Sequence, residues 1–157
     1  MRTEILVILP ADRGRLGRLL VEREGRTVFG PAPCFGRSDD RMARARGNAN
    51  RDPLKPFGDT PLGVYRCHLG AAAATPALVR SYGPHGWVAL DPVSGPALQA
   101  KKNCRFGLLI HGGDRNAAGK LRPTYGCVRL SNRDMGGLMS RLREAGGNRV
   151  SCRVEEG

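Results

Sequence analysis

Two residues in the second half of the chain have the types and the spacing needed for nucleophilic catalysis. Cys127 lies in the segment "PTYGCVRLS", and His111 precedes it by 16 positions. A thiolate is a strong nucleophile, and a neighbouring base or positive charge lowers the pKa of a cysteine from about 8.5 to roughly 3.5–7.5. The two residues therefore fit a cysteine–histidine pair with a thiolate of lowered pKa, which would suit acyl transfer. The alternative is that Cys127, like most free cysteines, is a small apolar residue in a β core.

The segment between these residues is suited to bring them together. It reads "GGDRNAAGKLRPT", which is polar and contains glycine, so it can loop out without burying apolar surface. His111 ends an expected strand in "CRFGLLIHGG", where residues are firmly held and open to a cleft. Gly112 and Gly113 leave its ring unobstructed.

The neighbours of Cys127 supply further candidates. Gly126 lets the backbone pass close to a ligand, and the N–H groups of Gly126 and Cys127 are expected to hold a developing oxyanion. Arg129 lies on the same side as Cys127 if the chain is extended there. We expect it to raise the thiolate character of Cys127 or to bind a substrate carboxylate.

The other four cysteines carry no sign of metal or disulfide chemistry. They stand far apart and form no C-x-x-C pair, which argues against a structural zinc site and against a dense disulfide framework. Free cysteine is among the most buried residue types, so they are expected to fill the core. They are Cys34, Cys67, Cys104 and Cys152. Neither a metal nor a cofactor is expected.

Local patterns predict several strands and one long loop. Residues 3–9 form a first strand, and residues 17–31 form a hairpin with its turn at Glu24-Gly25. The chain ends in a strand with alternating apolar residues over residues 148–156. Residues 36–53 are charged, small and rich in breakers, which predicts a long exposed loop.

One segment shows a strong helical pattern. In "SNRDMGGLMSRLREAGG" apolar residues recur at i, i+3, i+4 and i+7, and they are Met135, Leu138, Met139 and Leu142. Ser131 and Asp134 resemble a capping box, and Gly146 or Gly147 can close the helix. The apolar stripe is expected to face the core.

Length and composition limit the class of protein. A chain of 157 residues fits a single domain over residues 1–157, and 22 glycines with 11 prolines favour many short elements and mainly β structure. The net charge of +12 indicates an anionic partner. Few aromatic residues and no RNA-binding spacing argue against nucleic acid. The apolar run Ile5–Leu9 is too short for a signal-peptide core or a transmembrane segment.

These residues together resemble the L,D-transpeptidases with a YkuD-type catalytic domain. The signature of that family is a histidine, a spacer, then [ST]-H-G-C, a hydrophobic residue and Arg or Asn, to which "IHGG" and "TYGCVRLS" are similar. "DTPLGVY" resembles the family's T-P-x-G-x-[FY] segment. Tyr125 departs from the pattern, since the family usually has histidine there. The resemblance implies a mainly β, YkuD-like β-sandwich of mixed sheets with one C-terminal helix before the last strand.

The resemblance also implies a reaction on peptidoglycan stem peptides. Cys127 would attack the carbonyl at the L-centre of the third stem residue, release D-alanine and form a thioester, which an amine resolves into a 3–3 cross-link. His111 would act as general base and acid, with its ring oriented by the carbonyl of Gly112. Substrate contacts would come from Thr124, Tyr125, Gly126 and Arg129.

Two other functions fit the same residues. One is a secreted wall-targeting effector with L,D-carboxypeptidase or D-amino-acid exchange activity. The other is a non-catalytic basic module that binds an anionic wall polymer. The resemblance implies a periplasmic or cell-envelope location, although no signal peptide is visible, which indicates either a truncated sequence or signal-free secretion.

Overall fold

The computed structural model describes residues 2–72, 74–146 and 149–157, and its central feature is one mixed sheet of eight strands. Across the sheet the strands follow the order β3-β2-β1-β8-β4-β5-β6-β7. They are β1 (Thr3–Leu9), β2 (Gly17–Arg23), β3 (Arg26–Cys34), β4 (Gly63–Gly70), β5 (Trp87–Ser94), β6 (Leu109–His111), β7 (Val128–Arg129) and β8 (Val150–Glu156). The predicted mainly β class is confirmed.

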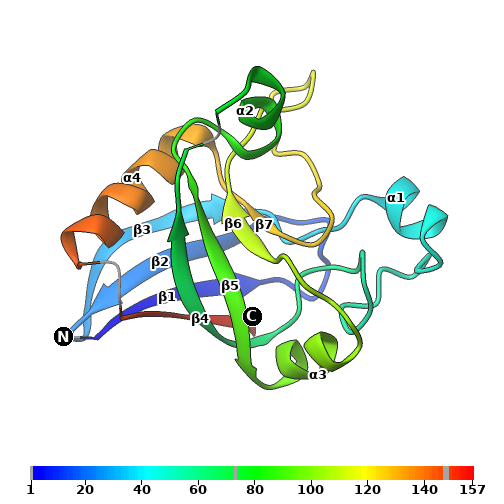
Figure 1. The fold of residues 1–157 in the computed structure, drawn as a ribbon, viewed down its shortest axis with the longest axis horizontal. Helices are drawn as coiled ribbons and strands as arrows, with labels where there is room; N and C mark the ends of the chain where they lie inside the picture. The colour runs from blue at the N-terminus through cyan, green and yellow to red at the C-terminus, as the bar shows by residue number, and fades with distance from the viewer. Residues whose placement is uncertain (1, 73, 147–148) are drawn as a thin grey trace.

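The sheet curves so strongly that it is nearly barrel-shaped. In Figure 1, β4 and β5 cross in front of β1, β2 and β3. β8 joins the two halves because it pairs parallel with β1 and antiparallel with β4. Fully buried side chains from both halves meet in one core, among them Ile5, Leu19, Val88 and Ile110. The arrangement agrees with the predicted sandwich, although its strands belong to one continuous sheet.

Two local predictions in the strands are confirmed. Glu24 and Gly25 connect β2 to β3 with φ values of 54° and 74°, the positive values that a two-residue hairpin turn requires. In β8, Val150, Cys152 and Val154 are buried, while the residues between them are less so. This alternation places one face of the last strand in the core.

Helices lie at the periphery of the sheet. They are α1 (Asp40–Ala45), α2 (Pro76–Tyr82), α3 (Pro96–Lys102) and α4 (Asn132–Glu144). Only α4, the helix before the last strand, was expected, because the other three are six or seven residues long and too short for a clear apolar period. No helix in the described ranges is long and apolar enough to cross a membrane.

The helix α4 forms as its sequence predicts. Oγ of Ser131 accepts a hydrogen bond of 3.0 Å from the N–H of Asp134, which caps the first turn. All four residues of the apolar stripe are buried. Gly146 follows the helix with a φ of 85°, whereas Gly147 lies outside the described residues.

The segment 36–53 differs from the expected exposed loop. It contains α1, whose first turn is capped by the carboxylate of Asp39, which accepts a 2.8 Å hydrogen bond from the N–H of Met42. Ala43 in this helix is fully buried. Asn48 is also buried and donates to the carbonyl of Asp52. A capped helical turn and buried side chains therefore order a segment whose charged composition indicated only a loop.

The expected burial of the other cysteines holds for three of the four. Cys34, Cys67 and Cys152 are buried, whereas Cys104 is exposed. Cys104 follows the end of α3 in the left-handed region, with a φ of 64° and its N–H bonded to the carbonyl of Lys101. The prediction for Cys104 was therefore wrong, because the helix ends there and turns this side chain away from the core.

Candidate active site

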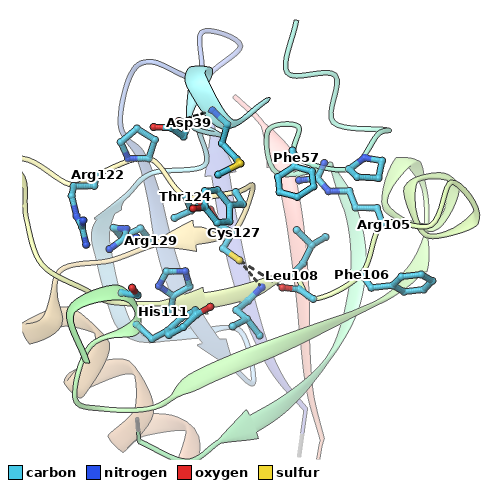
Figure 2. Close-up of a pocket in the computed structure, with 18 of the residues that line it drawn as sticks. Asp39, Phe57, Arg105, Phe106, Leu108, His111, Arg122, Thr124, Cys127 and Arg129 are labelled. Atoms are coloured by element: carbon cyan, nitrogen blue, oxygen red, sulfur yellow. Dashed lines mark hydrogen bonds between the residues drawn. The ribbon is translucent and has the colours of Figure 1, made fainter. Parts of the chain in front are cut away.

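Most of the candidate residues identified from the sequence line a cavity of about 970 Å³. Cys127, His111, Arg129, Thr124 and Tyr125 all line it. Its size falls within the range of small-molecule sites, about 300–1,000 Å³. Figure 2 shows Cys127 near the middle of the cavity, with His111 and Arg129 on one side of it.

The pairing of β6 with β7 brings the histidine and the cysteine together. The two strands run parallel, with Ile110 opposite Val128 and His111 opposite Arg129. This register places Cys127 beside Leu109, and Sγ of Cys127 accepts a 3.3 Å hydrogen bond from the N–H of Leu109. His111 and Cys127 are consequently diagonal neighbours on one face of the strand pair.

The ring of His111 is held in a single orientation. Its Nδ1 lies 2.6 Å from the carbonyl oxygen of Gly112, and Nη1 of Arg129 donates to the same oxygen at 3.2 Å. The edge of Tyr82 contacts the ring, with centroids 4.9 Å apart. Since Nδ1 donates to the carbonyl, Nε2 carries the lone pair and is the atom able to accept a proton.

The environment of His111 keeps its ring neutral. Burial lowers the pKa of His111 to about 4, and the positive charges of Arg129 and Arg122 act in the same direction. The hydrogen bond to Gly112 opposes this effect. Near pH 7 the imidazole is therefore unprotonated, as a general base must be.

Cys127 differs from the expectation of a lowered pKa. Burial raises the pKa of its thiol above the usual value, although the N–H of Leu109 and the charges of Arg105 and Arg129 favour the thiolate. The resting pair is thus a neutral thiol beside a neutral imidazole. The sequence indicated the nearby cations but not the burial, which outweighs them.

A pH titration of alkylation tests this neutral pair. Because the thiol of Cys127 has a raised pKa, its reaction with iodoacetamide is expected to rise about tenfold per pH unit up to about pH 9. Mass spectrometry of the peptide containing Cys127 measures the rate, with the exposed Cys104 as an internal reference for the reagent. A level rate between about pH 5 and 8 would instead show a thiolate–imidazolium pair.

The turn before the cysteine is held by Thr124. Its Oγ1 accepts a 3.0 Å hydrogen bond from the N–H of Gly126 and donates one of 2.8 Å to the carbonyl of Cys127. Of the two N–H groups expected to hold an oxyanion, that of Gly126 is therefore already engaged. The N–H of Cys127 donates to no group in the described part of the chain and stays available.

The segment from Thr60 to Tyr65 makes a hydrogen bond to the same turn. Oγ1 of Thr60 donates a 2.7 Å hydrogen bond to the carbonyl of Gly126, and Thr60 is fully buried. The hydroxyl of Tyr65, also fully buried, donates to the carbonyl of Pro61 at 2.6 Å. The first contact joins this segment to the turn before Cys127, and the second holds the segment itself.

Substitution of Thr60 tests this support. Thr60→Val removes the donor and leaves the buried carbonyl of Gly126 without its partner, so the free energy of unfolding is expected to fall by about 1–3 kcal/mol. Urea denaturation measures the change. Thr60→Ser keeps the hydroxyl and is expected to retain most of the stability. A larger loss in Thr60→Ser than in Thr60→Val would instead assign the effect to packing of the methyl group, which valine keeps and serine lacks.

Arg105 was not anticipated as part of the site. It is 3% exposed and donates to the carbonyls of Gly58 (2.6 Å) and Asp59 (2.8 Å). A Cβ added to Gly126, whose φ is 112°, would lie 1.8 Å from Nη2 of Arg105. Glycine is required there because the buried guanidinium fills the space, and this cation lies close enough to favour the thiolate of Cys127.

The backbone after His111 has two partners that sequence reasoning also missed. Oδ1 of Asn132 accepts a 2.8 Å hydrogen bond from the N–H of Gly113, and the carbonyl of Tyr82 accepts one of 3.0 Å from Gly112. Asn132 had no signal beyond its place at the start of a helix. Together the two contacts hold the carbonyl of Gly112 where it orients the histidine ring.

Tyr125 lies at the mouth of the cavity. It is 58% exposed, and its ring centroid lies 5.8 Å from that of Phe57. Phe57 has a φ of 65°, unusual for a bulky residue, and the guanidinium of Arg46 lies 5.3 Å from its ring centroid. Tyr125 and Phe57 therefore form an aromatic wall on one side of the cavity.

The lining of the cavity is cationic. Four arginines and one carboxylate contribute to it, and they are Arg41, Arg105, Arg122, Arg129 and Asp39. Such a lining favours an anionic ligand. In residues 2–72, 74–146 and 149–157, no three His, Cys, Asp or Glu side chains are grouped closely enough to hold a metal ion.

Comparison with known proteins gives likeness in fold only. No protein-family model matches the sequence, and no curated protein matches it significantly. Solved structures with a similar fold include the helical cell shape determining protein Pgp2 from Campylobacter jejuni, at 19% identity and a TM-score of 0.48. Another is the Ldtfm–avibactam carbamoyl enzyme, at 15% identity and a TM-score of 0.46.

The likeness covers nearly all of this chain but only part of the others. It extends over 99% of this chain and 48% of the Pgp2 chain. For the Ldtfm complex the shares are 98% and 49%. The chain thus spans about half the length of the solved structures that it matches.

Proposed function

We propose that this chain is a cysteine-dependent acyltransferase of the L,D-transpeptidase type that acts on peptidoglycan stem tetrapeptides. The observation that carries the proposal is that Cys127 and His111 line one cavity, with Nδ1 of the histidine bonded to Gly112. That bond leaves Nε2 free to accept the thiol proton. The resemblance of the segments around both residues to the L,D-transpeptidase signature supplies the substrate class.

Acylation proceeds from the neutral pair. Nε2 of His111 accepts the proton of the Cys127 thiol while Sγ attacks the carbonyl at the L-centre of the third stem residue. The oxygen of that carbonyl becomes negatively charged and is stabilised by the N–H of Cys127. The C–N bond then breaks, the imidazolium gives its proton to the nitrogen of D-alanine, and a thioester to Cys127 remains.

The second half of the reaction depends on the acceptor. An amine attacks the thioester carbonyl, transfers its proton to Nε2, and forms a new amide as the thiolate leaves and takes that proton back. An amine from a neighbouring stem gives a 3–3 cross-link. A free D-amino acid gives exchange, and water gives a tripeptide. The same residues serve all three outcomes, and the proposed place of action is the cell envelope.

Analysis of muropeptides tests this function. The protein is incubated with disaccharide-tetrapeptide, and products are separated by liquid chromatography and identified by mass spectrometry. A dimer lighter than two donors by one D-alanine supports transpeptidation, whereas tripeptide alone assigns carboxypeptidase activity. Unchanged tetrapeptide, together with binding of the protein to the polymer, would favour the non-catalytic basic module.

A further inference from the structure

Two arginines lie beside the proposed general acid–base residue. In the pairing of β6 with β7, Arg129 stands opposite His111. Arg122 comes from the loop between the histidine and the cysteine. Figure 2 shows both arginines on the same side of Cys127 as His111, while Arg105 lies on the other side. Both also line the cavity.

Backbone carbonyls hold both guanidinium groups in place. Nε of Arg122 donates to the carbonyl of Asp114 at 2.7 Å, and its Nη2 donates to that of Arg80 at 2.9 Å. Nη1 of Arg129 donates to Gly112 at 3.2 Å. Nε of Arg129 is buried and has no hydrogen-bond partner in the part of the chain that the structure describes. The two side chains are therefore fixed, and they keep N–H donors available for a ligand.

Among the described residues neither arginine forms an ion pair, although the negative charge of Asp114 acts on Arg129 from farther away. No carboxylate lies within ion-pair distance of Arg122 or Arg129 among the described residues. Arg129 is 5% exposed, and burial together with the charge of Arg122 lowers its pKa to about 10. Two neighbouring cations, one of them desolvated, are costly unless an anion binds between them.

The reaction chemistry indicates which anion would bind. The nitrogen of the leaving residue must lie at Nε2 of His111, because that atom returns the proton. In an α-amino acid the carboxylate is attached to the carbon next to that nitrogen. A leaving residue whose amine is at His111 can direct its carboxylate toward the arginine pair, which lies on the same side of Cys127 as His111 (Figure 2).

We propose, building on the transpeptidase function above, that Arg122 and Arg129 form a carboxylate site that recognises the α-amino acid leaving from or entering the thioester. A guanidinium matches the geometry of a carboxylate and forms charge-assisted hydrogen bonds with it. The site accepts the terminal carboxylate of a tetrapeptide donor. It equally accepts an incoming D-amino acid, or the D-centre of a diamino acid, in which an amine and a carboxylate share one carbon.

Comparison of two donors tests the site. One donor is the disaccharide-tetrapeptide with a free terminal carboxylate, and the other is the same molecule ending in D-alaninamide. The wild-type protein is expected to favour the free acid in kcat/KM by a factor on the order of 100. Arg122→Gln is expected to lower kcat/KM for the acid about 10- to 100-fold and to leave the amide nearly unchanged.

The ratio between donors separates recognition from folding. Both substrates are measured on one preparation, so a smaller folded fraction lowers both rates equally and leaves the ratio intact. Arg122→Lys keeps the charge without the planar fork and is expected to give an intermediate ratio. Arg115→Gln is the matched control, because this substitution removes the same charge from the same loop. Arg115 is exposed and does not line the cavity.

The outcomes also distinguish this inference from the proposed function. Equal turnover of acid and amide by the wild-type protein would overturn the carboxylate site and leave the transpeptidase function standing. A ratio unaltered in Arg122→Gln would overturn the role of Arg122. Absence of turnover with either donor would refute the proposed function itself, and the inference with it.

Discussion

Cys127→Ala is expected to lower turnover of the tetrapeptide by a factor on the order of 10⁴ or more while the protein remains folded. No thioester forms without Sγ, and no other cysteine occupies its position beside His111. The thiol contributes little to stability, since its polar contacts are a 3.3 Å bond from Leu109 and a 3.7 Å contact to Gly107. Chromatographic assay of released D-alanine measures activity, and circular dichroism checks the fold.

A core cysteine supplies the control for this substitution. Cys34 is fully buried at the end of β3 and does not line the cavity. Cys34→Ala is expected to lower stability but to keep the activity of the folded protein. Activity retained in Cys127→Ala, or lost to the same degree in Cys34→Ala, would contradict the assignment of the nucleophile.

His111→Ala is expected to lower the rate of acylation by about 10²- to 10⁴-fold and to change its dependence on pH. In the wild-type protein the pKa of about 4 keeps the base unprotonated, so the rate is level around neutral pH and falls only as acid protonates His111. Without the base, the reaction depends on thiolate formed by Cys127, whose pKa is raised. The rate of the variant should therefore rise with pH throughout the neutral range.

Rapid-mixing measurement of acylation at a series of pH values checks this expectation. The slope of log rate against pH is near zero for the wild-type protein and near one for the variant. A wild-type profile with a midpoint near pH 6.5 would indicate a solvated, unshifted histidine instead. Identical profiles in both proteins would remove His111 from the mechanism.

The elements predicted from sequence are those specified by neighbouring residues. Ser131 and the apolar stripe determine α4 within a few turns, and Glu24-Gly25 determines the hairpin turn by its own positive φ values. The alternating strand at the end of the chain is equally local. Because each signal lies within one element, its structure could be predicted without knowing the partners of that element.

Residues whose roles depend on distant contacts could not be found in this way. Arg105 contacts the carbonyl of Gly58, 47 positions away, and Thr60 contacts that of Gly126, 66 positions away. Neither has a local pattern that marks it as part of a site. Burial is likewise a property of the whole fold, which is why the direction of the pKa shift of Cys127 was not predicted.

Part of the site could be predicted because its signals also lie close together in the sequence. The spacing from His111 to Cys127 and the glycines beside them are visible in the chain, and the parallel pairing of β6 with β7 places the two residues in one cavity. The functions of Thr124 and Gly126 were less visible. Their hydrogen bond takes up an N–H group that the sequence alone left free.

Mass spectrometry of the digested protein tests the central claim most directly, because it detects the thioester and locates it on the peptide that contains Cys127. The protein is mixed with disaccharide-tetrapeptide, quenched in acid and digested. We expect an added mass equal to the donor less D-alanine, on the peptide that contains Cys127 and absent from Cys127→Ala. Release of D-alanine with the adduct on another residue, or with no adduct at any time of quenching, would contradict it.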